Sequence, residues 1–191
     1  MKIIGLTGGI GAGKSTVIAM FEAYGTPVYI ADTAAKRLMH SSQALKKAIQ
    51  ELLGDEAYKK DELNKEYIAS IVFSTPQKLA ALNALVHPAV RQDFMEFLKR
   101  QNAPYVLYES ALLLADDNHN LCDEIILVST PEEIRIQRVL ERDATNVAQI
   151  KARIENQLSD EEMRLKSHYI IENLSLEGTQ KCVDELHKYF S

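Results

Sequence analysis

Cysteine is scarce in this 191-residue chain, and the two that occur, Cys122 and Cys182, lie far apart. Neither belongs to a CxxC pattern or has a histidine at metal-ligand spacing, so we expect small buried apolar side chains, no disulfide and no structural zinc. No run of 18 apolar residues occurs, and an apolar run begins at Ile3 without a charged leader before it. These absences predict a cytoplasmic protein in a reducing compartment that neither carries a signal segment nor enters a membrane.

Positive charge is also in deficit. The chain has 22 Lys and Arg against 27 Asp and Glu, a formal net charge of -5. Nucleic-acid affinity comes largely from neutralising phosphates with Lys and Arg, so this balance argues against a general nucleic-acid binder. The hydrophobic content of 46% suffices for the core of one domain with a modest insertion.

The most informative feature present is a phosphate-binding loop. Residues 8–15 match the pattern G-x-x-x-x-G-K-[ST] and follow a short apolar run at residues 3–6. Its glycines allow successive backbone amides to point into one concavity, where they can surround a triphosphate, and Lys14 adds a positive charge near the β and γ phosphates. Ser15 offers a hydroxyl for Mg²⁺. The pattern predicts that ATP is bound by Gly8, Gly9, Gly11, Ala12, Gly13, Lys14, Ser15 and Thr16.

The order of the predicted elements indicates an α/β fold. After the loop, Val17, Ile18, Phe21 and Tyr24 are spaced for one face of a helix, which Gly25 can end. Five short runs rich in strand-forming residues, mostly separated by helical patterns, predict a parallel sheet covered on both faces. They lie at 2–7, 27–31, 105–109, 124–129 and 168–172, and a packing helix is expected at 176–190.

About seventy residues without a strand signal separate the second and third runs. Apolar residues at helical spacing within 45–53, 68–73 and 86–98 predict amphipathic helices there. The excursion is too long for one crossover helix, so we interpret it as a helical insertion at the substrate-binding edge of the sheet.

Three positions at strand ends or helix starts carry candidate chemistry. Asp32 follows the second strand, where it can act as a general base for a substrate hydroxyl or cap a helix starting at Thr33. Glu109 ends the third strand, where it can contact Mg²⁺ or serve as a polar strand end, and we favour the metal. His87, followed by Pro88, is taken alone as the beginning of a long helix.

Arginines are concentrated between residues 134 and 166 of this otherwise acidic chain. Arg135, Arg138 and Arg142 are three and four residues apart, so one helix face can carry all three. Each could be a solvated residue. On a phosphate-handling protein, however, such a face can clamp transferring charge, and we favour this role for Arg138 and Arg142. The N-K-x-D and D-x-x-G patterns of guanine-nucleotide switches do not occur.

Taken together, these motifs make the chain resemble the dephospho-CoA kinase family along almost its whole length. The resemblance rests on the residues from Ile3 to Ser15, Ala31-Asp32, residues 85–88, residues 112–114, Gln137-Arg138, Arg142-Asp143, Arg153 with Gln157, and Asn173. Two departures are the absence of the usual proline and terminal glutamate after Glu109, and Ser167-His168 where the family often has Ala-Asp.

The resemblance implies a P-loop kinase with a five-stranded parallel sheet in the order 2-3-1-4-5, flanked by helices. Residues 1–33 and 101–191 would form the nucleotide-binding core, residues 34–100 a helical insertion that binds dephospho-CoA, and residues 139–165 a lid. Asp32 would be the catalytic base, assisted by Lys14, Arg138 and Arg142. Asp32 and His87 would contact the substrate, and Asn173 the nucleotide.

The implied reaction transfers the γ-phosphoryl of ATP, with Mg²⁺, to the ribose 3′-hydroxyl of dephospho-CoA. We expect a monomer or small homo-oligomer with no nucleic-acid or membrane partner. Two alternatives share the loop: another small-metabolite kinase, such as a shikimate or nucleoside monophosphate kinase, and a nucleotide-dependent switch. The acceptor that is phosphorylated distinguishes the kinases from one another, and a switch would bind ATP without acceptor-dependent ADP release.

Overall fold

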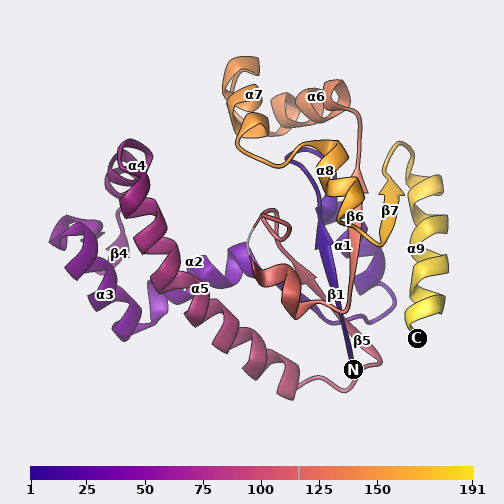
Figure 1. The fold of residues 1–191 in the computed structure, drawn as a ribbon, viewed down its shortest axis with the longest axis horizontal. Helices are drawn as coiled ribbons and strands as arrows, with labels where there is room; N and C mark the ends of the chain where they lie inside the picture. Colours follow the sequence, from indigo (N-terminus) through magenta and orange to yellow (C-terminus); the bar gives the residue numbers. More distant parts are fainter. Residues whose placement is uncertain (116) are drawn as a thin grey trace. The chain divides into compact units, whose positions relative to one another are not determined.

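The computed structural model describes residues 1–115 and 117–191, which divide into two compact units. Unit 1 consists of Met1–Ile30 and Gln101–Ser191, and unit 2 consists of Ala31–Arg100 (Figure 1). Unit 1 contains the sheet and the phosphate-binding loop.

The sheet of unit 1 has five parallel strands in the order β2-β5-β1-β6-β7. Counted along the chain, this is the predicted order 2-3-1-4-5, so the predicted sheet is confirmed. Strand β5 is buried at every residue, as expected for a parallel strand covered on both faces. The strands are β1 (Lys2–Thr7), β2 (Val28–Ile30), β5 (Tyr105–Glu109), β6 (Glu124–Ser129) and β7 (Tyr169–Glu172).

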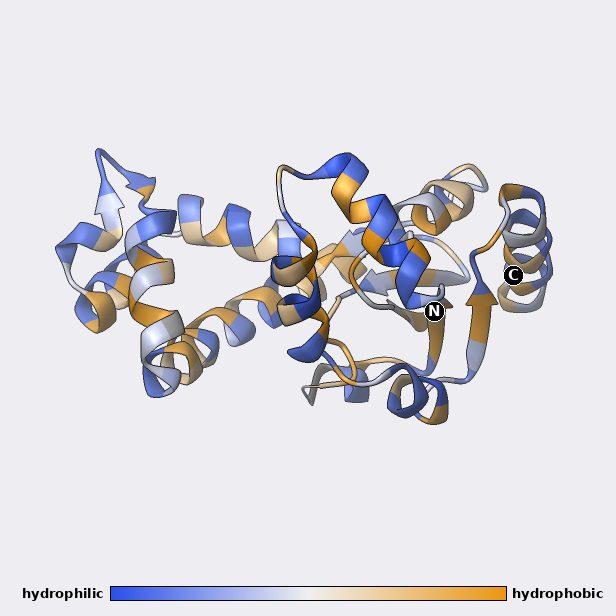
Figure 2. Ribbon diagram, turned by 90° about the horizontal axis from the view of Figure 1, so that it is seen from above, coloured by the Kyte–Doolittle hydropathy of each residue, from blue (hydrophilic) through white to orange (hydrophobic). Residues whose placement is uncertain are grey.

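Helices cover this sheet and complete the core. On one side, α1 (Lys14–Glu22) packs against α9 (Leu176–Phe190), and their buried side chains, among them Phe21 and Val183, join those of the strands. Figure 2 shows the resulting pattern, with strands largely in the hydrophobic colour and α9 divided between a polar and an apolar side. The remaining elements of unit 1 are η2 (Asp117–Leu121), α6 (Glu132–Arg142), α7 (Val147–Glu155) and α8 (Asp160–Leu165).

Two predictions about apolar side chains in unit 1 were too strong. Tyr24 lies beyond the end of α1, is 45% exposed and stacks on His187, although Gly25 does take the left-handed conformation, with φ 77°. Cys122 and Cys182 were expected to be buried, but both are only partly buried. Each of these residues lies at the margin of the core, where the sequence pattern is a poor predictor of burial.

Unit 2 is mainly helical, and its core forms where α2, α3 and α4 pack on the long helix α5. Leu45, Ile49, Val86, Val90 and Phe94 are buried there. The elements are α2 (Ala31–Ser41), α3 (Gln43–Leu53), η1 (Asp55–Ala57), β3 (Tyr58–Lys59), β4 (Glu62–Leu63), α4 (Lys65–Ser74) and α5 (Pro76–Lys99).

Unit 2 departs from the sequence-based expectation in two places. The short antiparallel pair β3–β4 lies in a region where no strand was predicted. Its turn residues Lys60 and Asp61 both have positive φ, 50° and 68°, without the Asn-Gly type of sequence that announces such a turn. Pro88 lies inside α5, so the prediction that His87-Pro88 begins a helix was wrong. A proline there removes one helical hydrogen bond, which the packing of α5 tolerates.

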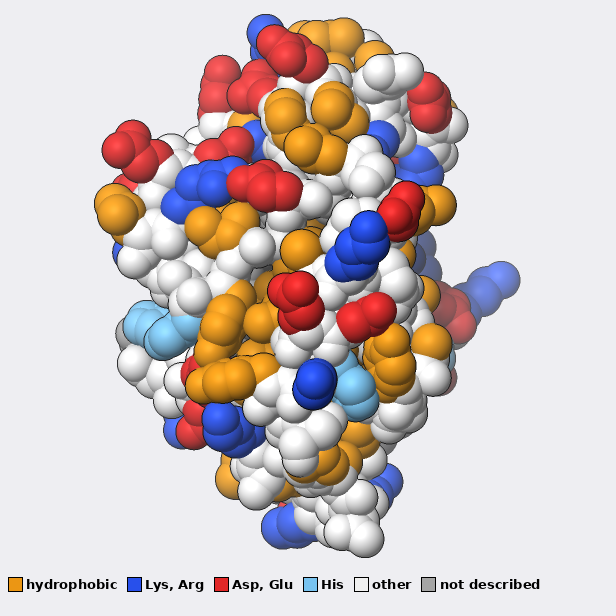
Figure 3. Space-filling view, turned by 90° about the vertical axis from the view of Figure 1, so that its right-hand side faces the viewer, with side chains coloured by type: hydrophobic (Ala, Val, Ile, Leu, Met, Phe, Trp, Pro, Cys, Tyr) orange, Lys and Arg blue, Asp and Glu red, His pale blue; other side chains and the backbone are white. Residues whose placement is uncertain are grey.

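The face of the molecule that carries α9 mixes apolar and charged side chains of both signs (Figure 3). Leu176 and Tyr189 are exposed on that helix. Among the described residues, no helix combines the length and apolar character needed to cross a bilayer.

Candidate functional site

The phosphate-binding loop joins β1 to α1 through residues 8–13. Gly11 and Gly13 have φ values of 78° and 90°, in the left-handed region that favours glycine. Gly13 is also the N-cap of α1, and it offers no side chain to cap the helix. The positive end of α1 is therefore left for an anionic ligand.

A buried cluster supports the loop through its carbonyl at Ala12. The Asn173 amide nitrogen donates to this oxygen at 2.8 Å, and the Thr130 hydroxyl donates to it at 3.1 Å. Thr179 on α9 in turn donates to the Asn173 amide oxygen at 3.0 Å. Asn173 thus acts on the loop backbone, and its predicted contact with the nucleotide stays a prediction.

The support leaves no room for a side chain at Gly13. An added Cβ would lie 2.0 Å from the Asn173 amide nitrogen. We expect Gly13→Ala to lower the free energy of unfolding by about 2 kcal/mol or more and to weaken ATP binding, because both the clash and the positive φ disfavour the native loop. Denaturant unfolding and ATP titration measure the two effects.

Gly25→Ala is the matched control for this prediction. Gly25 has a similar φ, but an added Cβ there meets nothing within 4 Å. It should lose only about 1 kcal/mol of stability and retain ATP affinity. Equal effects of the two variants on ATP binding would show that the loop's close contact with Asn173 is unimportant.

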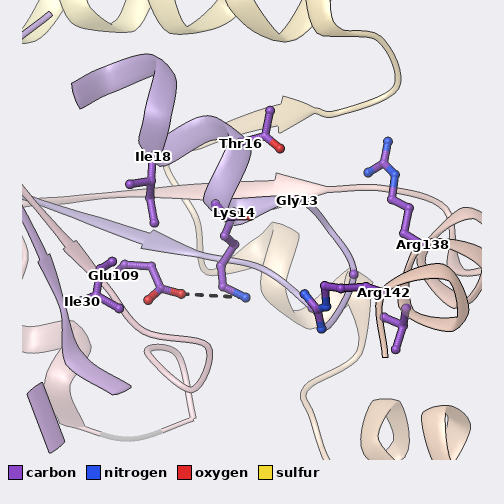
Figure 4. Close-up of a pocket in the computed structure, with 12 residues that line it drawn as sticks. Gly13, Lys14, Thr16, Ile18, Ile30, Glu109, Arg138 and Arg142 are labelled. Atoms are coloured by element: carbon purple, nitrogen blue, oxygen red, sulfur yellow. Dashed lines mark ion pairs between the residues drawn. The ribbon is translucent and has the colours of Figure 1, made fainter. Parts of the chain in front are cut away.

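A pocket of about 370 Å³ opens beside the loop. The Lys14 ammonium lies within it, donates to the Gly8 carbonyl at 2.9 Å and is 3.9 Å from the Glu109 carboxylate (Figure 4). Glu109 is buried, at the carboxyl end of β5. The pocket is lined by Gly9, Gly11, Gly13, Lys14, Ser15, Thr16, Ile18, Ile30, Glu109, Arg138, Val139 and Arg142.

The predicted arginine face of α6 divides into two parts. Arg138 and Arg142 line the pocket and extend from α6 in different directions (Figure 4). The Arg138 guanidinium donates to the Asn173 carbonyl at 3.0 Å, whereas that of Arg142 donates to both carboxylate oxygens of Asp143, at 2.8 and 3.0 Å. Arg135 is buried against the loop and does not line the pocket.

The Arg142–Asp143 contact favours the charged form of both groups. Its hydrogen bonds lower the pKa of Asp143 and raise that of Arg142. Both groups therefore stay charged at neutral pH, and the Arg142 side chain is mostly exposed. Arg142 can exchange Asp143 for another anion at little cost, since exposed ion pairs are weak.

The other predicted site residues, Asp32 and His87, belong to unit 2. Asp32 is exposed in the first turn of α2, which begins at Ala31, so the alternative that it caps a helix starting at Thr33 was wrong. Its carboxylate is still favourable beside the positive helix end. His87 is exposed on α5. The roles assigned to both side chains stay predictions.

Sequence reasoning missed the supporting residues Thr130 and Thr179. Thr130 directly follows β6 at the carboxyl edge of the sheet, so the rule that identified Glu109 could also have identified Thr130. Thr179 lies inside α9, which was treated as packing alone, and no local signal distinguishes its hydroxyl.

The pocket's oxygen ligands fit a magnesium ion shared with phosphates. Ser15 and Glu109 both line it, and Mg²⁺ usually binds through one or two protein oxygens together with substrate phosphates and water. Among the side chains that the structure describes, there is no group of three or more His, Cys, Asp or Glu that could hold a metal. The donor set thus suits a metal that arrives with its nucleotide.

Comparisons with known proteins agree with this geometry. The family model described as dephospho-CoA kinase matches residues 2–177. The dephospho-CoA kinase of Salinibacter ruber is 38% identical over 177 residues, which cover 91% of this chain and 89% of that protein. The dephospho-CoA kinase of Staphylococcus epidermidis is 34% identical over 193 residues, with coverage of 96% and 95%.

Solved structures show the same fold. TT1252 from Thermus thermophilus is 34% identical, with a TM-score of 0.90 and coverage of 100% of this chain and 98% of that one. Shikimate kinase from Acinetobacter baumannii is 16% identical, with a TM-score of 0.58 and coverage of 99% and 92%, a likeness of fold alone. The family match and the identities decide between these kinases, and they show that this chain belongs to the dephospho-CoA kinase family.

Proposed function

We propose that the pocket of unit 1 binds the triphosphate of ATP and that Asp32 prepares the acceptor hydroxyl. As a member of its family, the protein is a kinase that converts dephospho-CoA to CoA, the final step of coenzyme A biosynthesis. The γ-phosphoryl of ATP passes to the ribose 3′-hydroxyl, giving ADP. The roles of individual residues are our assignment.

One observation carries this assignment. Four segments far apart in the sequence contribute to one pocket: the glycine-rich loop, the end of β2, the end of β5 and α6. Together they supply backbone donors, an ammonium, a carboxylate and two guanidinium groups. Phosphoryl transfer needs little more from a protein than alignment of donor and acceptor and stabilisation of charge on the transferring group.

Lys14, Arg138 and Arg142 supply the positive charge in this scheme. Lys14 exchanges its contact with the Gly8 carbonyl for the β and γ phosphates, while the exposed Arg142 side chain leaves Asp143 for the transferring group. Such charges act strongly in a site without water. We propose that residues 139–165, which include α7 and α8, form the lid that excludes water and so prevents hydrolysis of ATP.

Asp32 is assigned as the general base, and chain connectivity supports this role. Ile30 lines the pocket and Asp32 follows two residues later, so their backbones are separated by at most about 7 Å. The exposed carboxylate of Asp32 can accept the proton of the 3′-hydroxyl as the new bond to phosphorus forms. The insertion 34–100, with His87, is assigned to the dephospho-CoA substrate.

Ser15 and Glu109 are assigned as the residues that hold Mg²⁺ with the ATP phosphates. When bound, the ion would neutralise part of the negative charge of the phosphates. We further propose a cytoplasmic enzyme that works as a monomer or small homo-oligomer without nucleic acid or membrane. The acidic composition supports the absence of a nucleic-acid partner.

Loss of the Ser15 hydroxyl tests the metal assignment. We expect Ser15→Ala to raise the Mg²⁺ concentration needed for half-maximal turnover by about tenfold, the effect of losing one favourable polar contact to a charged partner. Turnover is measured across a Mg²⁺ titration at saturating ATP. Ser167→Ala, on a serine after α8, is the control and should not shift the titration. An unshifted titration of Ser15→Ala would remove this hydroxyl from the metal site.

Acceptor-dependent turnover tests the function as a whole. The protein should release ADP from ATP only when dephospho-CoA is present, and mass analysis of the acceptor should find one added phosphate. Shikimate and nucleoside monophosphates serve as control acceptors, because a shikimate kinase shares the fold. The proposal would be contradicted if ADP were released without any acceptor, or if release required shikimate or a nucleoside monophosphate instead of dephospho-CoA.

A further inference from the structure

Arg135 is a buried charge that the proposed mechanism does not use. It lies on α6, its residue is only 3% exposed, and one guanidinium nitrogen donates to the Asp160 carboxylate at 2.9 Å. Its Nε atom is buried and has no hydrogen-bond partner among the described residues. A guanidinium stays protonated in proteins, so this part of unit 1 permanently contains a positive charge whose hydrogen bonding is incomplete.

Stability alone is a poor explanation for such a residue. Replacing a buried ion pair with apolar side chains of similar volume is often neutral or stabilising, because desolvation offsets the attraction between the charges. The pairing here is also unequal. The Asp160 side chain is 48% exposed and so is screened by water, whereas the Arg135 side chain is 3% exposed. Asp160 therefore leaves much of the positive field of Arg135 uncompensated inside the protein.

The guanidinium lies directly against the phosphate-binding loop. A Cβ added to Gly9 would be 2.1 Å from an Arg135 terminal nitrogen, and one added to Gly11 would be 2.5 Å from the Arg135 carbonyl oxygen. Gly9 and Gly11 themselves line the pocket. The Arg135 guanidinium thus lies next to backbone of the loop that borders the space assigned to the triphosphate.

A neighbouring contact holds the same part of the loop. The Gln157 side-chain oxygen accepts a hydrogen bond from the Ile10 backbone N–H at 3.0 Å. Gln157 lies between α7 and α8, three residues before Asp160, the partner of Arg135. The segment that neutralises part of the Arg135 charge is therefore attached to the loop tip as well.

We propose that Arg135 is a positioning residue for nucleotide binding, whose charge acts on the triphosphate through the Gly9 backbone. This inference rests on the proposed function insofar as the pocket is taken to bind ATP. Arg135 touches no phosphate, and it adds positive potential to the loop while packing against Gly9 and Gly11. Its effect should grow with the charge of the ligand, which a purely structural residue would not produce.

Titration of the full chain with ATP, ADP and adenosine at fixed Mg²⁺ tests this proposal. Arg135→Met keeps the volume and removes the charge, and we expect the Kd for ATP to rise about tenfold, that for ADP less, and that for adenosine by less than twofold. Equal weakening for all three ligands, or unchanged ATP binding, would overturn the proposal. Lys2→Met is the matched control, since the Lys2 ammonium pairs with Glu124 outside the proposed lid and has no loop contact among the described hydrogen bonds.

Asp160→Asn separates charge from packing. It breaks the same ion pair but leaves the guanidinium beside the loop, so we expect the Kd for ATP to stay unchanged or fall. A structural role predicts instead that it weakens ATP binding as Arg135→Met does, and this result would overturn the proposal even if Arg135→Met did not fold. These titrations need no acceptor, so absence of dephospho-CoA turnover would reject the proposed function and leave this inference intact.

Discussion

Replacement of Lys14 by alanine should lower kcat about 10²- to 10³-fold, the loss typical of removing one group that stabilises transition-state charge. The Lys14 ammonium lies in the pocket at the start of α1, close to the Glu109 carboxylate and bonded to the Gly8 carbonyl. Among the described residues, the pocket lining contains no other lysine. Steady-state turnover at saturating ATP and dephospho-CoA measures the effect, and thermal unfolding of the variant shows whether the fold is retained.

Lys181→Ala is the matched control for this prediction. Lys181 is an exposed lysine on α9 whose ammonium pairs with Glu177 one helical turn earlier. It should leave kcat and ATP affinity unchanged. If Lys14→Ala turned over at the wild-type rate, the phosphate-binding loop would have no part in the chemical step.

The second large effect is expected at Asp32. Asp32→Asn keeps the size and hydrogen-bonding reach of the side chain but cannot accept a proton, so kcat should fall about 10²- to 10⁴-fold, the range for a general base. ATP affinity should change little, because the triphosphate is assigned to residues of unit 1. Single-turnover rates and ATP titration separate chemistry from binding.

Asp55→Asn, at an exposed aspartate of the same unit, controls for loss of one negative charge. It should keep nearly full activity. Near wild-type turnover by Asp32→Asn would show that Asp32 is not the general base and that its carboxylate only stabilises the first turn of α2. A rise in the KM for dephospho-CoA without loss of kcat would assign it to substrate binding alone.

The sheet and the loop could be predicted from sequence because their signals are local. Five apolar runs correspond to β1, β2, β5, β6 and β7, and the glycine pattern places the loop between β1 and α1. The strand order, by contrast, came from the resemblance to a family. Periodicity gives the existence of strands and helices, but it does not say which strands are neighbours.

The details that sequence did not predict depend on tertiary contacts. Arg135 and Arg138 are three residues apart, a spacing that predicts one shared helix face. In the structure, however, Arg135 is buried against Gly9 and Gly11, whereas Arg138 lines the pocket. The turn at Lys60 and Asp61 lacks the usual glycine or asparagine signal. Pro88 lies within a helix because packing overrides its low propensity.

The hydrogen bond from Thr179 to Asn173 links helix α9 to the phosphate-binding loop. The family match ends at residue 177, but this hydroxyl lies beyond it and reaches the loop carbonyl of Ala12 through one amide. We therefore expect that weaker packing of α9, caused by shortening the helix or by substituting its buried side chains, changes the affinity for ATP. The hydrogen bond between Asn173 and the Ala12 carbonyl thus connects segments that are 161 positions apart in the sequence.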